Sequence, residues 1–71
     1  MYTIIDTISK YPWTILCLRL PNGEEKYWCM WTDHFEEEFP EAYRAVPQMN
    51  IKIDKLPKRG SWIKKSEINK I

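Results

Sequence analysis

Residues 13–31, WTILCLRLPNGEEKYWCMW, decide the fold of this chain. Two apolar runs flank the four turn residues 20–23, LPNG. Proline presets the backbone of the second turn position, asparagine suits the third, and glycine accepts the positive φ of the fourth. We therefore predict an antiparallel hairpin whose type I turn is closed by a bulge.

The turn also fixes the register of the hairpin, because loop length decides which residues face each other. The expected cross-strand partners are Leu20 and Glu24, Arg19 and Glu25, Cys17 and Tyr27, Leu16 and Trp28, and Trp13 and Trp31. An ion pair and a pair of tryptophans are favourable cross-strand neighbours.

Both faces of the predicted hairpin are apolar. One face carries Trp13, Ile15, Cys17, Tyr27, Cys29 and Trp31, and the other carries Leu16, Leu18, Leu20, Trp28 and Met30. An antiparallel sheet with one face in water normally alternates polar and apolar side chains. Both faces must therefore be covered, and we expect the rest of so short a chain to cover only one.

Residues 2–9 form the element before the hairpin. They are rich in β-branched side chains, which favour a strand. A helix is the competing interpretation, because Ile4, Ile5 and Ile8 have helical spacing and Thr3 with Asp6 resembles a capping box. We prefer the strand, which Pro12 would end in either case.

A helical segment follows over residues 33–46. An apolar stripe at helical spacing comprises Phe35, Phe39, Tyr43 and Val46. Asp33 with Glu36 resembles a capping box. Proline is comfortable only in a first turn, so Pro40 predicts a short turn over 34–38 and a helix from about 40 to 45, which Pro47 ends.

Two short strands complete the chain. Residues 49–54 alternate, with Met49, Ile51 and Ile53 on one side, as expected for a half-buried strand. A basic turn over 57–60 leads to a last strand over 61–65, with Trp62 or Ile63 pointing inward. A helical turn is expected from residue 66 onward.

The order β-β-β-α-β-β predicts an α+β fold. We expect a small antiparallel sheet of four to five strands with one short helix packed on one face. At 71 residues, the chain has room for a single domain over 1–71.

Several classes of protein are disfavoured by composition. No apolar run approaches the roughly 18–20 residues that a membrane span needs, and the first residues lack the pattern of a secretory signal. The two cysteines, Cys17 and Cys29, are too few for a disulfide scaffold and fit a cytoplasmic location.

We predict no catalytic residue, metal site, cofactor or small-molecule substrate. Cys17, Cys29 and His34 provide only three soft or imidazole ligands, whereas structural zinc sites use four. His34 is expected at the surface, and two glycines are too few for a phosphate-binding loop. The chain is therefore predicted not to be an enzyme.

Charge is unevenly distributed along the chain. Residues 1–47 hold four basic and eight acidic side chains, a net charge of −4, and residues 48–71 hold seven and two, a net charge of +5. Such asymmetry can mark a binding surface. Alternatively, the basic segment lies across the acidic one.

Protein binding is the function that the sequence favours. Four tryptophans and four tyrosines are more than so small a core is expected to hide, and these residue types dominate interface energies. The competing interpretation is that the tryptophans fill the core. The predicted interface residues are Trp13, Tyr27, Trp28, Trp31, Glu36, Glu37 and Glu38.

The expected partner is a larger protein or a second copy of the chain. The acidic group would steer the domain toward a basic target. In size and composition the chain is similar to the small accessory or inhibitor proteins that phages and mobile elements encode, an analogy that suggests inhibition of a host protein.

Binding of RNA or single-stranded DNA is the alternative. The residues that would carry it are Lys58, Arg59, Trp62, Lys64 and Lys65. Lysines follow phosphates and an aromatic ring can stack on an unpaired base. Against it, the acidic segment would repel phosphate.

Overall fold

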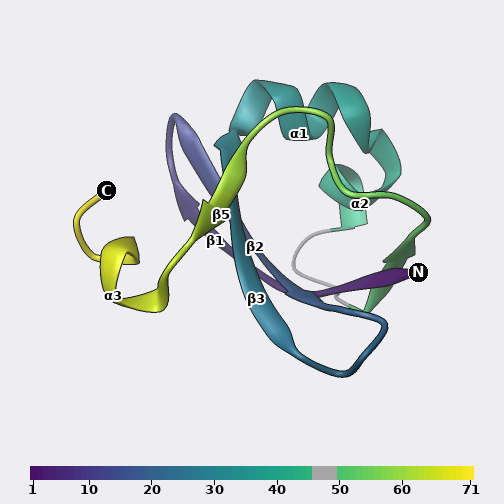
Figure 1. Cartoon of the computed structure of the whole chain (residues 1–71). Helices are drawn as coiled ribbons and strands as arrows, with labels where there is room; N and C mark the ends of the chain where they lie inside the picture. Colours follow the sequence, from purple (N-terminus) through teal and green to yellow (C-terminus); the bar gives the residue numbers. More distant parts are fainter. Residues whose placement is uncertain (46–49) are drawn as a thin grey trace.

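The computed structural model describes residues 1–45 and 50–71, which build one antiparallel sheet of five strands and three short helices (Figure 1). The strands are β1 (Tyr2–Lys10), β2 (Trp13–Arg19), β3 (Glu25–Trp31), β4 (Ile51–Ile53) and β5 (Ser61–Ile63). The helices are α1 (Thr32–Glu38), α2 (Pro40–Ala45) and α3 (Lys65–Ile68). The predicted α+β class is confirmed.

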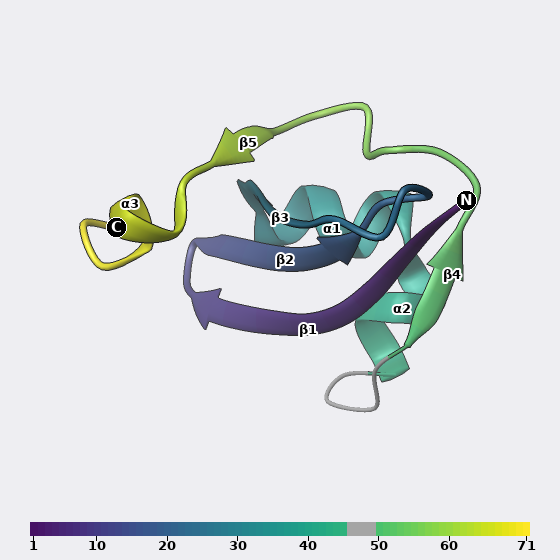
Figure 2. The ribbon, with the colours of Figure 1, turned by 60° about the horizontal axis from the view of Figure 1, so that its bottom comes forward.

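The arrangement of these elements differs in detail from the expectation. The strands lie in the order β4-β1-β2-β3-β5, so the last two strands border opposite edges of the sheet. Two consecutive helices, α1 and α2, stand where one was expected, and α3 lies apart from them beyond β5 in both views (Figures 1 and 2).

The hairpin of β2 and β3 forms in the predicted register. Its paired residues include Arg19 with Glu25 and Trp13 with Trp31. The carbonyl of Leu20 accepts a hydrogen bond of 2.9 Å from the amide of Gly23, whose φ is +91°. The amide of Leu20 donates to the carbonyl of Glu24 at 2.7 Å, which closes the turn.

The first element is a strand, and the helical interpretation of residues 2–9 is wrong. β1 pairs with β2 from Thr3 to Lys10, with one irregularity between Ile4 and Asp6. Pairing along the whole strand outweighs a local helical spacing, because it satisfies the backbone groups of two strands at once.

The predicted break at Pro40 is confirmed, since α1 ends at Glu38 and α2 begins at Pro40. The predicted capping box of Asp33 and Glu36 is wrong. α1 follows β3 directly and begins at Thr32, so Asp33 lies inside the first turn and no side chain caps the helix. Val46, Pro47 and Met49, which were assigned to the helical stripe, the helix end and the fourth strand, lie outside the described residues.

The main core lies between the sheet and helices α1 and α2. Its buried residues are Ile4, Leu16, Leu18, Trp28, Met30, Phe35, Ala42 and Ile53. Phe39 and Tyr43 pack around it from the predicted helical stripe. The face of the hairpin that carries Leu16 is therefore the one that the helices cover.

The opposite face of the hairpin is closed at its centre and open at one end. Ile15 and Cys17 are buried there, although α1 and α2 lie on the other side. Trp31, at the end of β3, is 49% exposed. The expectation of an uncovered second face thus holds only at this end of the sheet.

Candidate functional site

Three aromatic rings meet at the open end of the sheet, and we call Trp13, Trp31 and His34 the tryptophan cluster. Trp13 and Trp31 are cross-strand partners whose rings meet edge to face, with centroids 5.6 Å apart. His34 stacks on Trp31 at 5.9 Å and 19°. This stacking follows from the start of α1 directly after Trp31, which places His34 less than one helical turn further along.

A hollow of about 450 Å³ adjoins the tryptophan cluster. Its wall also includes Gly60 and Trp62 from the β5 side and Glu67 from α3. Segments far apart in the sequence therefore surround one aromatic depression. Sequence analysis identified Trp13 and Trp31, but the contributions of His34 and Glu67 to this surface were not predicted.

Trp28, another predicted interface residue, belongs to the core. It is 8% exposed, and its indole Nε1 donates a hydrogen bond of 3.1 Å to the carbonyl of Arg59. Trp62 packs edge-on against it, with centroids 4.9 Å apart, and remains 42% exposed. Tyr27 is half-buried and pairs with Ile63 of β5. Trp28 is therefore not available to a partner.

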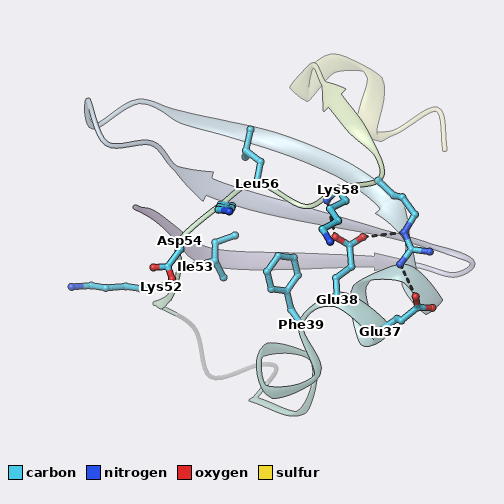
Figure 3. Close-up of a pocket in the computed structure, with 10 residues that line it drawn as sticks. Glu37, Glu38, Phe39, Lys52, Ile53, Asp54, Leu56 and Lys58 are labelled. Atoms are coloured by element: carbon cyan, nitrogen blue, oxygen red, sulfur yellow. Dashed lines mark hydrogen bonds and ion pairs between the residues drawn. The ribbon is translucent and has the colours of Figure 1, made fainter.

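Two of the three predicted acidic interface residues bind the basic segment of the same chain. Glu38 accepts hydrogen bonds from the amide of Lys58 at 2.7 Å and from Nε of Arg59 at 3.1 Å. Glu37 accepts a hydrogen bond from Nη2 of Arg59 at 3.0 Å (Figure 3). The hydrogen bond that Arg59 donates to Glu38 is the main cause that raises the pKa of Arg59. Glu36 remains exposed.

The largest hollow described, about 960 Å³, lies beside these ion pairs. Figure 3 shows Phe39, Ile53 and Leu56 along it, with the charged side chains of Lys52 and Asp54 at one end. None of the residues predicted to form a protein interface lines this hollow except Glu37 and Glu38. The signal that could have found it is Leu56, an isolated apolar residue within a charged segment.

The residues predicted to bind nucleic acid do not all line one hollow, although Arg59 and Trp62 both border the hollow beside the tryptophan cluster. Lys58 and Arg59 are tied to α1 by the contacts with Glu37 and Glu38. The other three, Trp62, Lys64 and Lys65, line a separate hollow of about 670 Å³ with Glu25, Lys26, Tyr27, Ile63 and Glu67. Two carboxylates thus stand among the lysines that would face phosphate.

Both cysteines are free thiols. Burial is the main cause that raises the pKa of Cys17, with Glu25 and Asp6 adding to it, and burial also raises the pKa of Cys29.

Within residues 1–45 and 50–71, no three His, Cys, Asp or Glu side chains are grouped to hold a metal ion. None of the helices in these ranges is long and apolar enough to span a membrane.

The thiols predict a loss of stability at alkaline pH. The pKa of each thiol is higher in the folded chain than its ordinary value of 9.0, so the unfolded chain ionises first as the pH rises. The free energy of unfolding should therefore fall once the pH exceeds about 9. Urea unfolding at a series of pH values should show a shallower fall in a Cys17→Val/Cys29→Val variant, and equal slopes would contradict the assignment.

The two carboxylates that bind Arg59 should differ in their contribution to stability. The side chain of Glu38 is 11% exposed, and Glu38→Ala removes the acceptor that the Lys58 amide and Arg59 Nε share, so it should lower stability more than a change at Glu37. Glu37 is 71% exposed, so Glu37→Ala should cost less than about 1 kcal/mol. Thermal unfolding of the two variants compares these losses, and an equal loss would refute the ranking.

No protein-family model matches this sequence, and comparison with curated proteins and with solved structures finds no similar chain.

Proposed function

We propose that this chain is a non-catalytic protein-binding domain whose contact surface is centred on the tryptophan cluster. The observation that carries the proposal is the exposure of Trp31, which leaves about half of a large ring in water at the open end of the sheet. Two rings pack against it, that of Trp13 edge to face and that of His34 stacked. Rigid, partly exposed aromatic side chains are the usual anchors of protein interfaces.

The proposed partner is a protein with a basic surface. Asp33 and Glu36 are exposed on α1, directly after Trp31, and Glu67 borders the adjoining hollow. Carboxylates beside a partly exposed indole ring favour arginine and lysine side chains, through ion pairs and cation–π contacts. The acidic contribution to binding therefore rests on Glu67, with Asp33 and Glu36 exposed on the adjoining helix, because Arg59 already binds Glu37 and Glu38.

The non-catalytic part of the proposal is supported by His34. Catalysis would require this histidine to be oriented by a carboxylate beside a nucleophile. Instead its ring lies flat against Trp31, where it extends the aromatic surface. The free thiols support a cytoplasmic location for the domain, and the origin in a phage or mobile element rests on size and composition alone.

Capture from a lysate of the cells that naturally make the chain tests the proposal. Immobilised wild-type protein should retain one protein, and a Trp31→Ala variant should lose it. The matched control is Glu24→Lys, which changes an exposed residue in the turn at the opposite end of β3 and should retain the protein. Retention by Trp31→Ala as strong as by wild type would overturn the proposal.

Charge and salt provide the second arm. Glu67→Lys should weaken capture, because it reverses a charge in the wall of the hollow that adjoins the cluster, whereas the aromatic contribution should survive moderate salt. A pool of mixed-sequence single-stranded oligonucleotides at low salt tests the alternative function. Binding of that pool by wild type and its loss in Lys64→Glu/Lys65→Glu would favour nucleic acid and overturn the proposal.

A further inference from the structure

The outer edge of β1 is only partly paired. β4 pairs with β1 through Tyr2, Thr3 and Ile4 alone. From Asp6 to Lys10 the other edge of β1 pairs with β2, and no strand among residues 1–45 and 50–71 pairs with the outer edge. Figure 2 shows β4 beside the first part of β1 only. Unpaired strand edges are templates for another strand.

One hydrogen bond identifies which backbone groups face this open edge. The amide of Thr7 donates to Oδ1 of its neighbour Asp6 at 2.8 Å, so it is directed away from β2. Backbone groups alternate in direction along an antiparallel strand. Ser9, two residues further along, therefore presents its amide and carbonyl to the same edge.

The residues along the open edge are complementary to themselves. Read in opposite directions, two copies of Asp6-Thr7-Ile8-Ser9-Lys10 place Ile8 opposite Ile8, each Thr7 opposite a Ser9, and each Asp6 opposite a Lys10. One such antiparallel pair of strands would therefore contain two ion pairs between Asp6 and Lys10, one at each end. Within the described residues, Asp6 and Lys10 form no ion pair in the single chain.

We propose that two copies of this chain associate through antiparallel pairing of their β1 edges, centred on Ile8. Thr7 and the partner's Ser9 would exchange two backbone hydrogen bonds, and the two-fold symmetry repeats this exchange, because both residues face outward. Ile8 would then lie in a non-hydrogen-bonded pair, in which opposing side chains are closest. The carboxylate of Asp6 would leave the Thr7 amide for the partner's Lys10.

Pairings centred one residue to either side of Ile8 lose the two ion pairs between Asp6 and Lys10. Centring the pair on Thr7 sets Asp6 against the partner's Ile8, and centring it on Ser9 sets Ile8 against the partner's Lys10. Either shift exchanges two ion pairs for contacts between a charge and an apolar side chain, which are less favourable. The self-complementary charges therefore select the register centred on Ile8. This association uses the edge of β1, where Lys10 is the cross-strand neighbour of Trp13, and does not require the exposed ring of Trp31.

A charge exchange tests the proposed register. Sedimentation over a range of protein concentrations should show a weak dimer for the wild-type chain, because the paired edge is short. Asp6→Lys alone and Lys10→Asp alone turn two attractive pairs into two repulsive ones and should each weaken dimerisation about tenfold. The Asp6→Lys/Lys10→Asp double variant should restore it.

Restoration by the double variant separates pairing from folding, since a variant that damaged the monomer would not be rescued by a second charge reversal. Ile8→Cys supplies an independent measurement, because cysteines at the centre of the register should form an intermolecular disulfide under mild oxidation. Asn22→Cys, in the distant exposed turn, is the matched control and should not. A chain that stays monomeric at its highest soluble concentration, or a double variant as weak as the single ones, would overturn the proposal.

Discussion

Replacing Gly60 by alanine should cost this domain most of its stability. The backbone of Gly60 has a φ of +109°, and an added Cβ would lie 2.5 Å from both the carbonyl oxygen of Cys29 and Nε1 of Trp28. Relieving these contacts requires the start of β5 to move away from β3. We expect a loss of about 3–5 kcal/mol from strain and overpacking together, against a total stability of about 4–10 kcal/mol for a domain of this size.

The matched control is Gly23→Ala in the hairpin turn. Gly23 has a similar φ of +91°, but nothing lies within 4 Å of the position of its Cβ. Its loss should be limited to the backbone cost, about 1–2 kcal/mol. Urea unfolding followed by tryptophan fluorescence compares the two variants. Equal losses would mean that the close approach of Gly60 to β3 has no energetic consequence.

Phe35→Ala should cause a loss of similar size at a different place. Phe35 is 2% exposed, and its ring contacts those of Phe39 and Tyr43, with centroids 6.4 and 6.1 Å away. Truncation removes the side chain that joins α1 to the core and leaves a cavity, at a cost of about 3–5 kcal/mol. Calorimetric or circular-dichroism melting measures it.

Phe39→Ala controls for the loss of an aromatic ring. Phe39 lies at the margin of the same core and is only half-buried, so its truncation should cost distinctly less than that of Phe35. If the two variants melt at the same temperature, Phe35 does not have the central position in the core that its burial indicates.

The parts of the fold that the sequence predicts are those fixed by local chemistry. The turn around Asn22 and Gly23 set the whole register of β2 and β3 because one loop length allows one pairing. Pro40 predicted the start of α2 because a proline tolerates a first helical turn and disrupts an interior one.

The order of the strands could not be predicted in this way. β4 and β5 have three residues each, and nothing local distinguishes the edge at β1 from the edge at β3. Their positions depend on contacts between distant residues, such as the hydrogen bond from the Trp28 indole to the Arg59 carbonyl. The ion pairs of Arg59 likewise became visible only once α1 was placed beside the segment before β5.

Only part of the candidate site could be predicted, because here too the outcome depends on how distant elements pack. Alternation along the hairpin correctly separated Trp13 and Trp31 from Trp28, but two apolar faces gave no means to decide which would be core. Which face becomes core is decided by α1 and α2, because both helices pack on the face that carries Leu16. That choice buries Trp28 and leaves Trp31 partly in water.

The placement of β4 and β5 has a consequence for synthesis of the chain on the ribosome. Both outermost strands come from residues 51–63, although they border opposite margins. A nascent chain can therefore fold its first three strands while both margins stay bare, and it acquires the two flanking strands almost together, once residues 51–63 have been made. Before β4 and β5 pair, the growing polypeptide exposes two unpaired strand edges that could aggregate. Protection by a chaperone would matter most during this interval.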